Sequence, residues 1–129
     1  MATNFETSKP IYMQIVDTIF QRIVRGEIGP GEKLASVREM AIHSGVNPNT
    51  IQRSYAEMER MGVVETKRGQ GTFVIEGEII VERLRHTMQT EIISQFVKSM
   101  EELGISRQQM ISRLESFLKE GEQNDDPLK

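Results

Sequence analysis

Hydrophobic residues near the start of the chain fall on two adjacent helical rows. Between residues 10 and 25 they recur every four positions, as Ile11, Ile15, Ile19 and Ile23 and as Tyr12, Val16, Phe20 and Val24. Two neighbouring rows make a stripe broader than a coiled-coil seam, which is typical of a helix packed on a globular core. Ser8 can cap this helix and Pro10 suits its first turn, so we expect a helix over about 10–25.

The next polar and glycine positions predict two short helices in close succession. Ser36 and Glu39 have the spacing of a capping box at a helix start, and Gly45 can supply the left-handed residue that ends that helix. Asn47 and Pro48 then suit the N-cap and first residue of another helix. Two helices joined by a short turn that includes a glycine form a helix-turn-helix.

Two short β-rich runs follow, at 63–66 and 72–75, with a glycine-containing turn at 67–71 between them. This arrangement predicts a β-hairpin. A helix-turn-helix followed by a hairpin is the element order of a winged helix. Residues 1–76 are therefore expected to form a winged helix-turn-helix domain.

Beyond residue 76 the hydrophobic period becomes helical again, with apolar residues every four positions from Ile80 to Met100. Ser106 and Gln109 form a second capping box, which predicts another helix to about residue 119, and the polar tail from about 121 is expected to fray. The fold class is thus mainly α with a small β-hairpin. Its winged helix is followed by a two-helix C-terminal dimerisation segment over 77–129.

A two-helix hairpin of this size buries too little surface to be stable alone. Its apolar stripe must pack on the winged helix, on a second copy of the chain, or on both. We expect homodimerisation through Leu84, Met88, Ile92, Phe96, Met100, Leu114 and Phe117. The methionines could line an adaptable ligand site, but core filling is the simpler interpretation. A small-molecule effector, if there is one, would lie at the dimer interface or between the tail and the winged helix.

The third helix carries the candidate base-reading residues. Ile51, Tyr55 and Met58 fall on one face, which should pack on the first helix. The opposite face and its flanks are polar, and the first two turns of such a helix would enter the major groove of DNA. Asn and Gln can pair with adenine and Arg with guanine, so the candidates are Asn49, Thr50, Gln52 and Arg53. Alone these could be ordinary solvent-facing residues; the short turn before them and the basic hairpin after them favour DNA contact.

The remaining candidates would position the domain on the DNA backbone. Arg38 and the helix start at Ser36 can bind phosphate. Gly69 and Gly71 in the wing allow the protein backbone to approach the DNA closely. The candidate DNA-binding set is Ser36, Arg38, Asn47, Asn49, Thr50, Gln52, Arg53, Lys67, Arg68, Gly69, Gln70, Gly71 and Thr72. The net charge of −3 does not oppose this. Residues 33–72 carry six basic and four acidic residues, and the net negative charge of the chain comes from residues 77–129.

The composition argues against other classes of protein. With no cysteine and only His43 and His86, the chain lacks the ligands of a structural metal site, and we expect neither metal nor cofactor. No nucleophile–base motif or phosphate-binding loop is present, so an enzyme is not expected. The N-terminus has no secretory pattern and no apolar run could span a membrane, which predicts a soluble cytoplasmic protein.

Several motifs occur in the order of a known family. Pro10-Ile11-Tyr12-x-Gln14-Ile15, Gly26-Glu27-Ile28-x-Pro30-Gly31-Glu32-Lys33-Leu34, Ser36-Val37-Arg38-Glu39 and Arg68-Gly69-Gln70-Gly71-Thr72-Phe73-Val74 together resemble the GntR family of bacterial regulators. Asn47-Pro48-Asn49-Thr50 and the short helical tail are similar to its YtrA-like subfamily. The resemblance implies a dimeric repressor, often of transporter genes. Many members carry arginines where this chain has Pro48 and Gln52, so their DNA contacts do not transfer to those positions.

These features are consistent with two functions. The first is a sequence-specific transcriptional regulator that binds a palindromic operator in double-stranded DNA as a homodimer. The second is a winged-helix module that binds protein instead, which an absence of salt-sensitive DNA affinity would favour.

Overall fold

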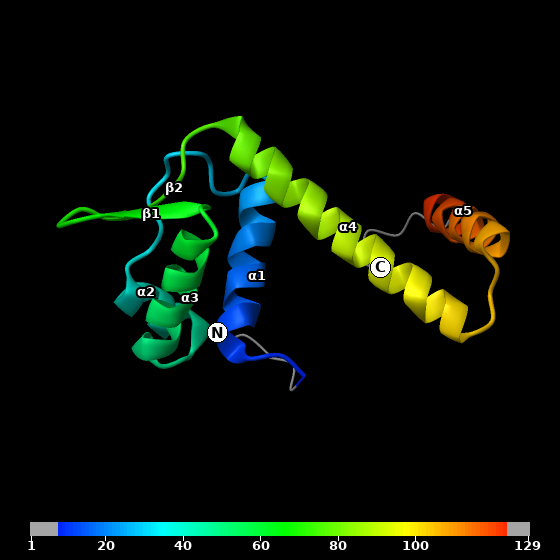
Figure 1. Ribbon diagram of the computed structural model, residues 1–129, viewed down its shortest axis with the longest axis horizontal. Coiled ribbons are helices and arrows are strands. Elements are labelled where there is room, and N and C mark those ends of the chain that lie inside the picture. The colour runs from blue at the N-terminus through cyan, green and yellow to red at the C-terminus, as the bar shows by residue number, and fades with distance from the viewer. Residues whose placement is uncertain (1–7, 124–129) are drawn as a thin grey trace. The chain divides into compact units, whose positions relative to one another are not determined.

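The computed structural model describes residues 8–123, which form five helices and one hairpin (Figure 1). The elements are α1 (Ile11–Val24), α2 (Val37–Ser44), α3 (Pro48–Arg60), β1 (Val64–Lys67), β2 (Gly71–Val74), α4 (Glu78–Glu102) and α5 (Arg107–Gln123). The chain divides into two compact units, one that extends through His86 and one that begins at Thr87. The predicted fold class, mainly helical with a small hairpin, is confirmed.

The core of the first unit lies between α1 and α3. The broad stripe predicted on α1 is buried over Ile15, Val16, Ile19, Phe20 and Ile23. On α3, Ile51 and Met58 are both 0% exposed. The predicted cap of α1 is wrong, because the helix begins after Pro10 and no side chain caps it, so Ser8 has no such role.

Local polar chemistry sets the ends of α2 and α3 as the sequence predicts. The Ser36 hydroxyl accepts a hydrogen bond from the Glu39 amide and the Glu39 carboxylate accepts one from the Ser36 amide, both at 3.1 Å. Gly45 ends α2 with a φ of 71°, in the left-handed region that costs glycine least. The Asn47 side chain caps α3 by accepting from the Asn49 amide at 2.8 Å. The helix-turn-helix is therefore built from these caps.

The capping box yields a stability prediction. Ser36→Ala removes the acceptor for the Glu39 amide, and loss of an N-cap of this kind costs about 0.5–2 kcal/mol. The expected result is a lower midpoint in urea denaturation. Glu39→Gln keeps an oxygen acceptor for the Ser36 amide and should retain most of the stability at neutral pH.

The same capping box has a pH dependence. Hydrogen bonds from the Ser36 amide and hydroxyl lower the pKa of Glu39 below its ordinary value of 4.5. A lowered folded-state pKa means that the carboxylate stabilises the fold above its unfolded pKa, and that this contribution is lost as pH falls through the folded value. The free energy of unfolding of Glu39→Gln should therefore fall less than that of the unmodified chain as the pH is lowered into the acidic range.

The wing is a two-stranded antiparallel hairpin in which Val64 pairs with Val74 and Lys67 with Gly71. The strands reach one residue closer to the turn than the sequence predicts. A third segment, which the sequence did not reveal, pairs with the hairpin. The Leu34 amide donates to the Thr72 carbonyl at 2.8 Å, and the Val74 amide donates to the Glu32 carbonyl at 2.9 Å. This pairing fixes the base of the wing to the start of α2.

The first turns of α4 belong to the first unit. Leu84 is only 7% exposed, and the Arg85 guanidinium donates to the Val24 carbonyl at the end of α1, at 2.6 Å. Leu84, which the sequence placed in the dimer interface, is thus buried within its own chain. Docking on α1 explains why this unit extends beyond the boundary predicted at residue 76.

The second unit consists of the rest of α4, a turn around Gly104, and α5. The predicted capping box is present, since the Gln109 amide donates to the Ser106 hydroxyl at 3.2 Å and the Ser106 amide to the Gln109 side chain at 3.0 Å. The helix continues to Gln123, past the predicted end near residue 119. Residues 124–129 of the predicted frayed tail lie outside the described residues.

Candidate nucleic-acid interface

The start of α3 presents a row of polar side chains to solvent. Asn49, Gln52 and Arg53 are exposed and Thr50 is half-buried, whereas Ile51 on the other face is completely buried. The predicted orientation of this helix is therefore confirmed. The side-chain oxygen of Asn47 caps the helix, so a contact from Asn47 to DNA would have to use its amide nitrogen.

The last turn of α3 is less available for a polar contact. The Arg60 guanidinium forms an ion pair and two hydrogen bonds with the Glu57 carboxylate. This pairing lowers the pKa of Glu57 and raises the pKa of Arg60. Because the pair is internally neutral, the helix offers its unopposed polar groups in its first two turns.

Arg53 has a neighbour that the sequence did not reveal. Its guanidinium carbon lies 3.9 Å from the centroid of the Tyr12 ring, which is a cation–π geometry. The helical rows placed Tyr12 on a buried stripe, yet it is half-buried and reaches the polar face of α3. Only the packing of α1 on α3 brings these two residues together.

The start of α2 is a second part of the candidate interface. Arg38 is exposed, and the Ser36 hydroxyl accepts from the Glu39 amide. Because the capping box occupies the amides of both Ser36 and Glu39, a phosphate at this helix start would be bound mainly by the exposed Arg38 side chain.

The wing supplies cations around a tight turn. Arg68, Gly69 and Gln70 are exposed at its tip, where Gly69 has a φ of +77°. The Lys67 ammonium lies 4.8 Å above the Phe73 ring and 3.8 Å from the Glu65 carboxylate. Thr72 is half-buried, with its hydroxyl 3.4 Å from that of Thr66.

Lys33 is a further wing cation that the sequence did not single out. Gly71 has a φ of +122°, and a β-carbon added there would lie 2.7 Å from Cε of Lys33. The Lys33 side chain therefore lies across the glycine, in space that only the missing side chain leaves open. The spacing between residues 33 and 71 gave no sign of this contact, because it depends on the segment that pairs with β2.

The predicted dimerisation residues fall in several places. Ile92, Phe96 and Leu114 line one apolar groove of about 650 Å³ in the second unit, together with Ile93, Val97, Arg107, Met110 and Ile111. Met88 and Met100 are half-buried. The groove is open to solvent, since Ile92 is 67% exposed.

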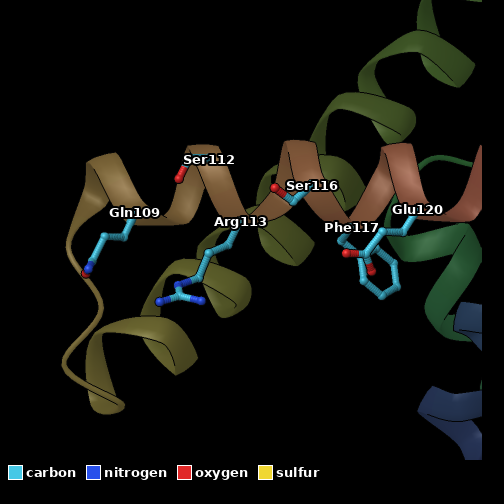
Figure 2. A pocket seen from close by; sticks show the side chains of 6 residues that line it. All are labelled: Gln109, Ser112, Arg113, Ser116, Phe117 and Glu120. Carbon is cyan, nitrogen blue, oxygen red and sulfur yellow. The ribbon is translucent and has the colours of Figure 1, made fainter.

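Phe117 lies in a different hollow, of about 520 Å³, which is lined from α5 alone (Figure 2). Figure 2 shows Gln109, Arg113 and Phe117 extending from α5, and Ser112, Ser116 and Glu120 complete the lining of the same hollow. A surface formed by one helix encloses nothing, so the hollow has no features of a ligand pocket.

Across 8–123 no group of three or more His, Cys, Asp or Glu side chains could hold a metal ion. Within the same range, no helix combines the length and apolar character needed to cross a membrane.

Known proteins include relatives with a similar sequence. Residues 11–74 match the family model of bacterial regulatory proteins, gntR family. The chain is 54% identical over 121 residues to the uncharacterized HTH-type transcriptional regulator YhcF of Bacillus subtilis strain 168, covering 94% of this chain and 100% of the relative. It is 36% identical over 124 residues to the HTH-type transcriptional repressor YtrA of the same strain, covering 92% and 95%.

Solved structures agree with the sequence relatives. A GntR family transcriptional regulator from Listeria monocytogenes superposes with a TM-score of 0.82 at 40% identity, covering 87% of this chain and 98% of that one. The DNA-binding domain of AraR in complex with operator ORX1 matches with a TM-score of 0.51 at 27% identity, over 57% of this chain and 90% of that one. The fold of the first unit is therefore one that binds operator DNA in a relative.

Proposed function

The chain belongs to the GntR family of bacterial regulatory proteins, and from this premise we propose that it is a homodimeric repressor of a palindromic operator. It is a DNA-binding transcriptional regulator and not an enzyme. The observation that carries the proposal is the exposed polar row of Asn49, Gln52 and Arg53 on a helix whose opposite face is buried. By analogy with its YtrA-like relatives, we propose transporter genes as its targets and the cytoplasm as its location.

In the proposed complex the first two turns of α3 enter the major groove. Gln52 and Asn49 carry the amide groups that pair with adenine, and Arg53 carries the donors that pair with guanine. Arg38, Lys33 and the wing cations neutralise phosphates on either side of the groove. Base contacts would give discrimination, and the phosphate contacts would give most of the salt-dependent affinity.

The second unit supports the proposed homodimer. Its only buried large hydrophobic residue among those described is Met110. Its exposed ones are Ile92, Ile93, Phe96, Leu103, Ile111, Leu114, Phe117 and Leu118. An apolar surface of this extent on so small a unit needs a partner to exclude water. A second copy is the occupant we propose, because two-fold pairing would also place two α3 helices on successive half-sites, about 34 Å apart or a multiple of that.

The decisive experiment is selection of bound sequences from a random DNA library by the full chain. The proposal expects an inverted repeat whose half-site spacing fits whole helical turns. Recovery of a single unrepeated site would contradict the palindrome, and the absence of any salt-sensitive DNA affinity would favour a protein-binding winged helix instead.

Gln52→Ala and Lys67→Ala distinguish a residue that contacts a base from one that contacts the DNA backbone. Gln52→Ala should relax selectivity at one base pair, by about 5- to 150-fold, because a bidentate base contact is lost. Lys67→Ala should weaken binding to all DNA sequences by the same factor. It should also reduce the magnitude of the slope of log K against log salt by about 1. Fluorescence anisotropy titrations over a range of salt concentrations measure both effects. A uniform loss from Gln52→Ala would reassign that residue to the DNA backbone.

A further inference from the structure

The stacked pair of Tyr12 and Arg53 joins the first turn of α1 to the base-reading side of α3. The guanidinium carbon lies 3.9 Å from the ring centroid, within the ~6 Å reach of a cation–π contact. Arg53 is exposed, so this contact with Tyr12 restrains a side chain that would otherwise be free to take many rotamers.

The backbone beneath the pair is also held. Ser54 is 0% exposed, and its hydroxyl donates to the Tyr12 carbonyl at 2.9 Å, within reach of the Thr50 carbonyl at 3.0 Å. A buried hydroxyl bonded across two helices fixes their relative placement at that point. The Tyr12 ring is therefore presented to Arg53 by a rigid support and not by a mobile chain end.

The surface beside the pair is open. A hollow of about 390 Å³ is lined by Pro10, Ile11, Tyr12, Asn49, Thr50 and Arg53. Three of these six residues are candidate base contacts on α3 and the other three come from the start of α1. The stacked guanidinium thus borders space that adjoins the predicted major-groove surface.

We propose that Tyr12 is a specificity-determining positioning residue, which holds Arg53 in the orientation that reads guanine. The ring occupies one face of the guanidinium, while all five N–H donors lie in the guanidinium plane and stay available. Bidentate pairing with guanine O6 and N7 uses donors in that plane. Stacking and base reading are therefore compatible, and the ordering of Arg53 is achieved before DNA binds. This inference rests on the proposed function.

The test uses the full chain, its selected operator, and operators changed at single base pairs. Arg53→Ala identifies the base pair that Arg53 reads, as the position where selectivity is lost. Tyr12→Leu should lower selectivity at that same position by about 2- to 30-fold, the range of a cation–π contact. Tyr12→Phe keeps the ring and should restore selectivity. In the Arg53→Ala background, Tyr12→Leu should cause no further loss, because the two residues act as one unit.

Arg25→Ala is the matched control for lost charge. Arg25 lies at the other end of α1, 69% exposed and paired with Glu27, so its removal should leave selectivity at that base pair unchanged. Additive losses from Tyr12→Leu and Arg53→Ala would overturn the proposal. So would an equal loss on every sequence, which would assign Tyr12 to the DNA backbone. If the unmodified chain shows no sequence selectivity, the proposed function itself fails.

A second measurement needs no DNA. The Arg53 side-chain Nε–H resonance of the free protein should show an upfield ring-current shift in the unmodified chain and in Tyr12→Phe, and should lose it in Tyr12→Leu. Absence of that shift in the unmodified chain overturns the stacked arrangement, whatever the DNA titrations give. Thermal unfolding of each variant shows whether the fold is retained.

Discussion

Ile51→Ala is expected to lower the free energy of unfolding by about 2–5 kcal/mol, a large part of the stability of a domain this size. Ile51 is 0% exposed on the face of α3 that packs on the core of the first unit. Truncation there removes buried methyl and methylene groups and leaves a cavity that neighbouring side chains fill only in part. Urea denaturation followed by circular dichroism measures the loss.

Ile42→Ala is the matched control, because the same atoms are removed from a residue that is 77% exposed on α2. It should change the free energy of unfolding by no more than about 0.5 kcal/mol. Similar losses from both variants would mean that α3 does not pack as described. DNA binding by Ile51→Ala should be weakened equally for all sequences, since the mutation lowers the fraction of folded chain.

Ile92→Glu is expected to convert the proposed homodimer to a monomer and to lower operator affinity by about 100-fold or more. Ile92 lines the apolar groove of the second unit and is 67% exposed within one chain. A carboxylate there would lose its hydration against the apolar side chains of the groove in the dimer, at a cost of several kcal/mol, and each 1.4 kcal/mol is about tenfold in affinity. Analytical ultracentrifugation at micromolar concentration measures the oligomeric state.

Ile79→Glu controls for the added charge. Ile79 is on the same helix, 73% exposed, in the first turn of α4 and outside the groove. This variant should stay dimeric and bind the operator as the unmodified chain does. A monomeric unmodified chain would contradict the homodimer, and a dimeric Ile92→Glu would place the contact on another surface of the second unit.

Much of the fold could be predicted because several of its helices begin or end at capping interactions between residues that are close in the sequence. The Ser36–Glu39 box, the left-handed Gly45 and the Asn47 cap each involve residues within three positions of one another. Their hydrogen bonds can therefore be inferred from spacing alone. The same holds for the face of α3 that presents Asn49, Gln52 and Arg53, since a period of 3.6 residues separates the buried side from the exposed one.

The sequence by itself thus determined the order of elements, the helix ends and the polar row that would read DNA. Only the tertiary structure decided which distant residues meet: Tyr12 with Arg53, Lys33 with Gly71, and the first turns of α4 with the end of α1. It also buried Leu84 within its own chain and left Ile92 exposed, although both lie on one helical row. The physical reason is that a repeating pattern specifies which face of a helix is apolar, whereas the surface that covers this face depends on contacts between segments far apart in the chain.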